Sequence, residues 1–374
     1  MSKRKKRIII TCITILSILI LIFGAIAFLL HSYLSKITYD TDEGIGEIAG
    51  EVLSEEEIRQ ELMAEETVSD EEDSPEDEIL ELEEQMAGQI KDNQEQGGQD
   101  AEQESGDSSD LTDAQGNVNI LVIGCDSRKK GGVGRSDAII LASISESAET
   151  IYMTSIMRDS YVSIPGKGNN RINAAYAYGG GKLLLDTVET NFAVDVEKYV
   201  SFDFYSFVDI VDSMGGIDIE VTEAEIPVLN SYVKELNKLN GRPEGTYYVT
   251  ESGLQHLNGT QALGYARIRY VGDGDFQRTE RQRIIVAKIL EKAKTLNLVQ
   301  INDLLNVFLP QVKTNLTQEE ILGLMFKAMD YLTYDLESMR LPVDDSWKYM
   351  RVNGMSVLGI DLEKNQRALE DFIH

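Results

Sequence analysis

The chain has 374 residues, of which 42% are hydrophobic, and its formal net charge is −29. A single core rarely grows beyond about 300 residues, so we expect one large domain with appended segments. The acidic excess is local, because residues 41–110 hold 27 Asp and Glu against only Arg59 and Lys91. The rest is nearly neutral. This distribution argues against a nucleic-acid-binding protein, which would need a basic field.

The N-terminus has the pattern of a membrane anchor. Residues 1–7 are basic, and an uncharged apolar run extends from Ile8 to Leu30. A helix of this length, at about 1.5 Å per residue, covers the roughly 30 Å hydrocarbon core. The basic cluster predicts a cytoplasmic N-terminus, a single pass through the cell membrane and an extracytoplasmic remainder. The alternative is a cleaved signal peptide, although no small-residue cleavage site follows.

An acidic segment rich in Gln, Ser and Gly separates this run from the remainder of the chain. Its low apolar content predicts a largely disordered stalk over residues 31–116. Four apolar residues at helical spacing leave open a short acidic helix or weak self-association: Ile79, Leu82, Met86 and Ile90. The extracytoplasmic domain is expected at residues 117–374.

Strands and helices alternate from Asn117 onward. Apolar, β-branched runs predict strands at 118–124, 138–144, 150–156, 199–202 and 217–221. Apolar residues at helical spacing predict helices at 174–192, 204–214, 276–296, 300–309 and 317–334. This alternation predicts an α/β fold.

Charged residues cluster where the first three of these strands should meet. The second and third strands are joined by only about six residues, which favours an antiparallel hairpin. If the first strand is also antiparallel to the second, three chain segments converge at one edge of the sheet. Those segments carry Asp126, Arg135, Asp137, Arg158 and Asp159.

Asp126 and Asp137 are our candidate metal ligands. Carboxylate oxygens are hard ligands of the kind that Mg²⁺ takes, usually one or two from the protein with phosphate and water completing the shell. The expected cofactor is therefore Mg²⁺, with Mn²⁺ as a second candidate. The alternative is that these aspartates only cap loops or pair with Arg135 and Arg158.

A second basic cluster lies between residues 265 and 283. Arg267 and Arg269 are two residues apart and would share a face of an extended segment. The helix predicted from about Phe276 carries cations in its first turns, which opposes the helix dipole. A bound anion would explain them, because guanidinium groups bind phosphate in a bidentate manner; the alternative is a solvated basic helix end paired with nearby acids. The residues on one side of this helix are Arg278, Arg281 and Gln282.

Three other features could belong to a site: a cysteine, a histidine and a set of bulky apolar residues. Cys125 has no histidine close in sequence, so we interpret it as a buried residue rather than a nucleophile, and Cys12 in the apolar run makes a disulfide implausible. His256 is interpreted as a packing or loop residue. Bulky apolar residues are either ordinary core or the lining of a slot for a polyprenyl chain: Phe192, Phe202, Phe207 and Val211.

Several long motifs in order resemble the LytR-CpsA-Psr family of cell-wall glycopolymer ligases. They are NILVIGCDSR, GRSDAIILASI, SIMRDSYVSIPG, RINAAYAYGGG, FVDIVDSMGGIDIEV, LQHLNGTQALGYARIRY and FQRTERQR, within roughly residues 117–300. The resemblance implies a three-layer α/β/α domain with a mixed central sheet. It also implies a phosphotransferase that binds polyprenyl pyrophosphate-linked glycan and transfers its glycosyl phosphate to a peptidoglycan hydroxyl.

The same resemblance assigns roles to residues. It implies Asp126 and Asp137 as metal ligands that act with Arg158 in catalysis. The implied pyrophosphate-binding residues are Arg135, Arg158, Arg267, Arg269, Arg278 and Gln282. Departures from the family pattern are Cys125, Met157 and Arg171, and the candidate general bases are Asp126, Asp159 and Asp275. Two other functions stay open: a non-catalytic envelope regulator or lipid-binding scaffold, and a polyprenyl pyrophosphatase.

Overall fold

The computed structural model describes residues 30–40, 111–126, 134–269, 271 and 275–374. Residues 8–29 of the predicted anchor and most of the acidic stalk lie outside these residues. Within the described part, no helix is both long enough and apolar enough to cross a membrane.

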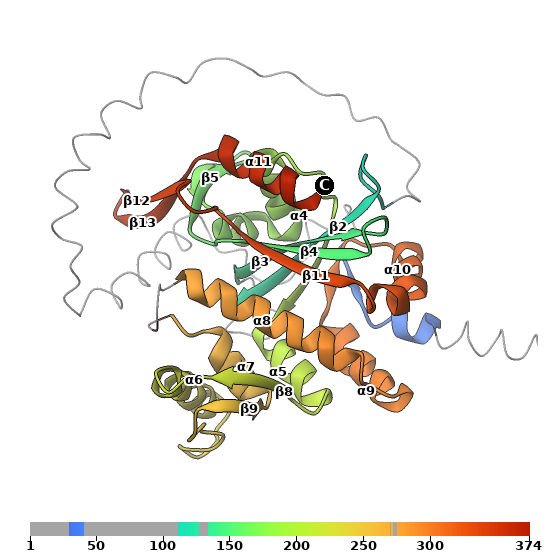
Figure 1. The fold of residues 1–374 in the computed structure, drawn as a ribbon, viewed down its shortest axis with the longest axis vertical. Coiled ribbons are helices and arrows are strands. Elements are labelled where there is room, and N and C mark those ends of the chain that lie inside the picture. Colours follow the sequence, from blue (N-terminus) through green and yellow to red (C-terminus); the bar gives the residue numbers. More distant parts are fainter. Residues whose placement is uncertain (1–29, 41–110, 127–133, 270, 272–274) are drawn as a thin grey trace, which may run out of the picture.

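A mixed sheet of seven strands forms the centre of the domain, in the order β1-β10-β7-β2-β3-β4-β11 (Figure 1). Strand β2 is antiparallel to β3 and parallel to β7, while β3 and β4 form the predicted antiparallel hairpin. The strands are β1 Thr38–Tyr39, β2 Asn117–Asp126, β3 Arg135–Ser145, β4 Thr150–Ile156, β7 Lys198–Asp203, β10 Lys313–Thr314 and β11 Asp335–Leu341.

Two smaller sheets flank the central one. The first has the strand order β12-β13-β5-β6 and the second pairs β8 with β9. Their strands are β5 Ser160–Ile164, β6 Gly168–Arg171, β8 Ile217–Val221, β9 Gly253–Leu257, β12 Trp347–Val352 and β13 Met355–Ile360.

Helices lie on both sides of the central sheet (Figure 1). They are α4 Asn173–Phe192, α5 Phe204–Ser213, α6 Glu225–Leu239, α7 Gly259–Ala266, α8 Asp275–Ala293, α9 Leu298–Phe308, α10 Gln318–Tyr331 and α11 Leu362–Ile373, with a 3-10 turn at Leu309–Gln311. Capping boxes at Asn258, Asn297 and Thr317 begin α7, α9 and α10, because each side chain accepts the main-chain N–H of the residue three positions on.

The hydrophobic core is divided between the two sides of the sheet. On one side, Leu121 and Ile123 of β2 pack with Leu184 of α4 and Leu369 of α11. A second cluster joins α5, α6, α7 and the β8–β9 pair around Val211. The expected α/β class with a mixed central sheet is confirmed.

Residues 30–40 differ from the expectation that the stalk begins at residue 31. A helical turn at 30–34 leads into β1, which pairs in parallel with β10 at the sheet edge. Leu34 and Ile37 are buried against Val312. These residues fold onto the domain because they add apolar side chains to an otherwise uncovered strand edge.

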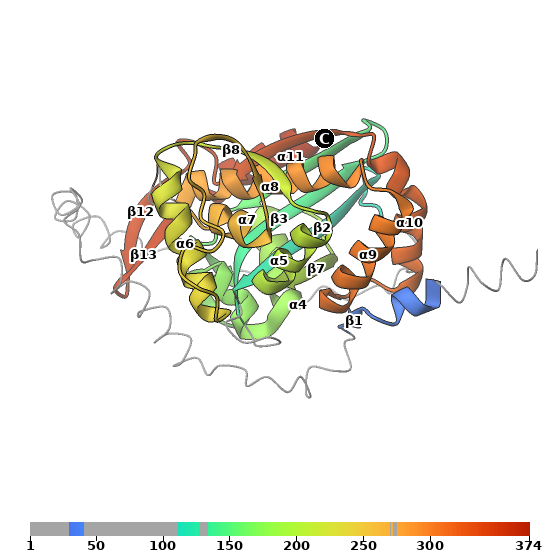
Figure 2. The same cartoon turned by 90° about the horizontal axis from the view of Figure 1, so that it is seen from below.

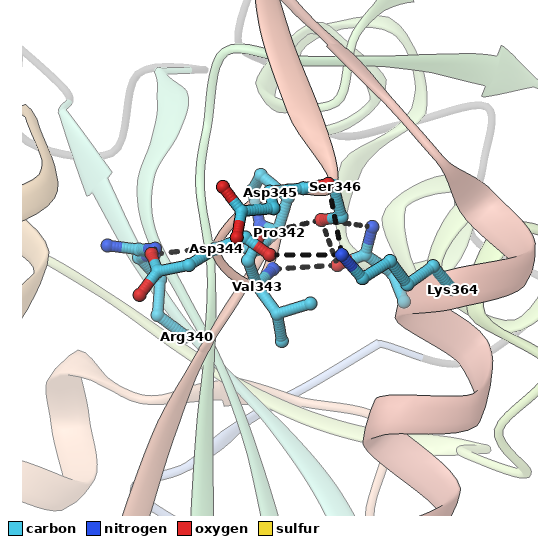
Figure 3. Close-up of polar contacts among 8 residues, drawn as sticks. Arg340, Pro342, Val343, Asp344, Asp345, Ser346 and Lys364 are labelled. Carbon is cyan, nitrogen blue, oxygen red and sulfur yellow. Dashed lines mark hydrogen bonds and ion pairs between the residues drawn. The ribbon is translucent and has the colours of Figure 1, made fainter.

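The connection from β11 to β12 is fixed by α11 (Figure 3). Lys364 Nζ donates to the main-chain oxygens of Asp344 (3.3 Å) and Asp345 (3.0 Å), and Ser346 Oγ donates to the carbonyl of Val343. The strand that follows begins at Trp347. Its ring lies 4.4 Å from that of Phe276 in the first turn of α8, so this connection supports the start of α8.

Candidate functional site

The predicted convergence of three chain segments at one sheet edge is present. Asp126 at the end of β2 lies opposite Arg135 at the start of β3, and β3 in turn pairs with β4, which ends at Ile156. Arg158 lies two residues beyond the end of β4. The antiparallel order therefore brings together residues that are more than thirty positions apart, as the strand pattern indicated. The side chain of Asp126 itself lies outside the described residues.

Asp137 is the centre of this cluster. Arg158 Nη1 donates to its Oδ1 at 2.8 Å, and Arg278 Nη2 donates to its main-chain oxygen at 2.7 Å. The same Arg278 nitrogen lies 3.8 Å from Asp137 Oδ2. Arg158 and Arg278 are also buried, with exposed fractions of 8% and 6%. Hydrogen bonds to one aspartate and burial together hold both guanidinium groups in fixed positions.

The electrostatics of Asp137 are dominated by its arginines. Burial alone would raise the pKa of its carboxyl group, but Arg158, Arg278 and Arg269 together lower the pKa well below its usual range. Asp137 is therefore ionised at neutral pH. The effect of Arg269 on this pKa also places its charge near the pocket.

Asp159 bridges Arg158 and one further guanidinium group, that of Arg171. One of its oxygens lies 3.4 Å from Arg158 Nε and the other lies 3.5 Å from Arg171 Nε. Arg171 Nε also donates to the carbonyl of Ser356 in β13, at 3.0 Å. Arg171, noted in the sequence as a departure from the family pattern, therefore connects the site to the smaller sheet.

An open pocket of about 270 Å³, a volume that includes space open to solvent, lies over these residues. Asp137, Arg158, Arg278 and Gln282 line it, and all four were predicted site residues. Thr279, which the sequence analysis did not select, also lines it. Thr279 could have been predicted as a pocket residue, because it lies three residues before Gln282 on the same face of the helix. The other lining residues are Ile139, Ile156, Met157 and Asp159.

Two arginines of the basic cluster point elsewhere. Arg267 pairs with Glu235 of α6 at 3.4 Å, lies over the ring of Tyr232 and does not line the pocket. Helix α7 continues to Ala266, so Arg267 is a helix cap and the predicted extended clamp with Arg269 is not formed. Arg281 forms a buried ion pair with Glu225 at 2.8 Å.

The metal prediction rests on few groups. Among the described residues, no three His, Cys, Asp or Glu side chains are placed to hold a metal ion together. Asp137 nevertheless offers an ionised carboxylate that lines the same pocket as Arg158 and Arg278. Mg²⁺ commonly takes one or two protein carboxylates with phosphate and water. Asp137 with Asp126 therefore fits the chemistry of such an ion.

The interpretation of Cys125 agrees with the structure, whereas His256 is neither a packing nor a loop residue, because it lies in strand β9 with an exposed side chain. Cys125 is buried, and its burial raises the pKa of the thiol to about 12, so it is not a nucleophile at neutral pH. His256 hydrogen-bonds Asp218 (2.6 Å) and the main-chain oxygen of Gly215 (2.7 Å) in the β8–β9 region. Neither lines the pocket.

The residues predicted to line a lipid slot belong to different parts of the hydrophobic core. Phe192 belongs to the cluster around α4 and α11, whereas Val211 and Phe207 belong to the cluster around α6 and α7. Phe202 is half-buried at the end of β7. Phe192 therefore lies in a different cluster from Phe207 and Val211, so these three side chains do not line a common space.

Comparison with known proteins gives a consistent result. The model of the LytR_cpsA_psr family matches residues 82–371. "Regulatory protein MsrR" of Staphylococcus aureus is 31% identical over 264 residues, which cover 69% of this chain and 75% of that protein. "Polyisoprenyl-teichoic acid--peptidoglycan teichoic acid transferase TagU" of Bacillus cereus is 33% identical over 230 residues, which cover 61% and 69%.

Solved structures share the fold. A structure described as TagT bound to LI-WTA has a TM-score of 0.55 and 27% sequence identity, and covers 68% of this chain and 88% of that one. TagT with bound octaprenyl pyrophosphate lipid has a TM-score of 0.51 and 25% identity, and covers 68% and 89%.

Proposed function

The chain belongs to the LytR_cpsA_psr family, and on that premise we propose that it is a phosphotransferase acting on the cell wall. It moves an anionic or phosphate-linked glycopolymer from a polyprenyl pyrophosphate carrier to peptidoglycan and releases polyprenyl phosphate. The observation that carries this proposal is the pocket in which Arg158 and Arg278 flank an ionised Asp137. The transferase name of TagU and the pyrophosphate lipid bound to TagT support it.

The arginines are suited to hold a diphosphate. Arg158 and Arg278 are buried and fixed by Asp137, so little side-chain entropy is lost when they bind phosphate oxygens. Gln282 lines the same pocket, the charge of Arg269 lowers the pKa of Asp137, and Arg135 begins the strand that carries Asp137. Positioned positive charge stabilises the additional negative charge of a phosphoryl-transfer transition state.

The reaction exchanges the phosphoanhydride bond of the carrier for a new phosphate ester bond to the acceptor. The acceptor sugar hydroxyl attacks the glycan-linked phosphorus and loses its proton. The bond from that phosphorus to the bridging oxygen breaks, and polyprenyl phosphate leaves with this oxygen. Asp159, a candidate base, lines the pocket beside Arg158.

Asp126 and Asp137 would hold Mg²⁺ at this site. Such an ion neutralises charge on phosphate oxygens and polarises them. Asp137 has a second role that needs no metal, because it orients both Arg158 and Arg278.

The proposed location follows from the N-terminal sequence. The apolar run at 8–30 anchors the chain in the cell membrane with residues 1–7 in the cytoplasm. The domain then lies on the extracytoplasmic side, where peptidoglycan and membrane-borne carriers are both accessible.

Product analysis distinguishes this function from its alternatives. The full chain in membranes is incubated with labelled lipid-linked glycan, with and without peptidoglycan fragments. A transferase gives glycan bound to peptidoglycan only when acceptor is present. Release of free glycan phosphate at the same rate without acceptor would identify a pyrophosphatase, and the absence of any product would favour the regulatory role that the name of MsrR indicates.

A further inference from the structure

Helix α10 carries an exposed apolar stripe. Leu322, Met325, Phe326 and Met329 recur at the spacing that places side chains on one face of a helix. Phe326 is 80% exposed, Met329 70% and Met325 39%, whereas Leu322 is half-buried at the border of the stripe. A group of large apolar side chains in contact with solvent marks an interaction surface.

The segment at residues 30–40 packs next to this stripe. Leu34 and Ile37 belong to a buried cluster whose border includes Ile321 and Leu322 of α10. Tyr33 also donates a hydrogen bond to Asn302 of the neighbouring α9. Figure 2 shows this segment, in blue, beside α9 and α10. Leu322 therefore borders both the docked segment and the exposed stripe.

The docked segment is held firmly. Strand β1 pairs with β10, and Asp40 directly after it accepts a hydrogen bond from the hydroxyl of Tyr199 and pairs with Lys313 at 3.1 Å. The apolar run of the sequence ends at Leu30, where the docked segment begins. With the membrane anchor that the proposed function assigns to residues 8–30, no spacer separates the anchor from the docked segment, so the chain would leave the membrane close to α10.

We propose that the α10 stripe inserts into the membrane interface and orients the domain on the lipid surface. The stripe therefore contacts the lipid bilayer, because the adjoining end of the predicted anchor holds α10 close to the membrane surface. The catalytic pocket lies at the other end of β4 and β11, beyond Ile156 and Leu341, whereas α10 leads into the start of β11 at Asp335. The pocket is then held about one strand length, roughly 20 Å, from the lipid surface.

A tryptophan reporter tests this orientation without measuring activity, so its outcome is independent of the proposed phosphotransferase. Trp347 is the single tryptophan, and Trp347→Phe provides a background for two reporters. Phe326→Trp places the reporter on the stripe. Leu254→Trp is the matched control, because Leu254 is 69% exposed on β9, away from α10. Both full-length variants are reconstituted in vesicles of phosphatidylethanolamine and phosphatidylglycerol, with and without acyl chains brominated near the headgroup.

We expect brominated lipid to quench the fluorescence of the tryptophan at position 326 at least twofold more than that of the tryptophan at position 254. Equal quenching at the two positions would overturn it. A blue-shifted emission at 326 without bromine quenching would also overturn it, since protein, either a second copy or another part of this chain, would then cover the stripe. Similar circular dichroism spectra for both variants establish that each is folded.

Discussion

Asp137 and Arg158 show how a buried carboxylate keeps its charge. Burial disfavours ionisation of Asp137, and three arginines reverse this effect. The lowered pKa means that the pair stabilises the fold above the pKa of an unfolded Asp, near 3.9, and loses that contribution as pH falls through the folded value.

Replacement of Arg158 by glutamine should therefore change stability in a pH-dependent way. Burial is then opposed by fewer charges, so the pKa of Asp137 rises towards that of an unfolded Asp and the loss of stability at acidic pH becomes smaller than in the wild type. At neutral pH we expect a cost of about 1–3 kcal/mol. Urea unfolding of the detergent-solubilised chain between about pH 2 and about 8 measures both effects. A pH profile identical to that of the wild type would show that Arg158 does not set this pKa.

Cys125 is expected to be inert despite its position beside Asp126. Because burial raises the pKa of its thiol to about 12, it should resist maleimide labelling at neutral pH in a Cys12→Ser background and react fully after denaturation. Cys125→Ala should retain turnover within about threefold, a change of less than 1 kcal/mol in the barrier. Loss of turnover by a folded Cys125→Ala protein would restore the nucleophile interpretation.

Among the helices, α5 and α7 depend on a close approach at Gly259. A Cβ atom at this position would lie 2.2 Å from the main-chain oxygen of Val208 in α5. The main-chain N–H of Gly259 also donates to Asp212 Oδ1 at 2.7 Å. The second core cluster therefore requires a residue without a side chain here.

Gly259→Ala should lower the free energy of unfolding by about 1–3 kcal/mol, because the two helix backbones must separate. The matched control is Gly323→Ala on α10, where a Cβ meets nothing within 4 Å. That substitution should raise stability by about 0.5–1 kcal/mol through helix propensity. Urea denaturation compares the two, and equal effects would contradict the packing described for α5 and α7.

The β2–β3–β4 edge and the helices α8 to α10 could be predicted because their signals are local. Strand periodicity and one short hairpin were sufficient to bring Asp137 near Arg158. The orientation of the Arg267 side chain could not be predicted from local sequence, because it depends on contacts with Glu235 and Tyr232 of α6. The lipid-slot prediction failed as a single site for a similar reason: sequence spacing does not reveal the side of the sheet on which Phe192 packs.

In the whole molecule, residues 30–40 belong to the folded domain rather than to the acidic stalk. Leu34 and Ile37 are the two buried apolar residues between the apolar run and the acidic segment. Two such residues form no recognisable pattern, so the sequence does not predict that this segment packs on the domain. Strand β1 completes the edge of the central sheet and brings Asp40 to Tyr199. The family resemblance is confirmed, and it extends through the C-terminal helix.

The proposed function depends on one pocket that neutralises a diphosphate. The most direct test measures the release of polyprenyl phosphate by the full chain in the presence of lipid-linked glycan and peptidoglycan acceptor. Arg158→Ala should reduce the rate by about 10²–10³-fold. Arg367→Ala, which removes a 68%-exposed side chain that pairs along α11 with Glu363, is the control and should be unchanged. Wild-type turnover by a folded Arg158→Ala protein would contradict the central claim.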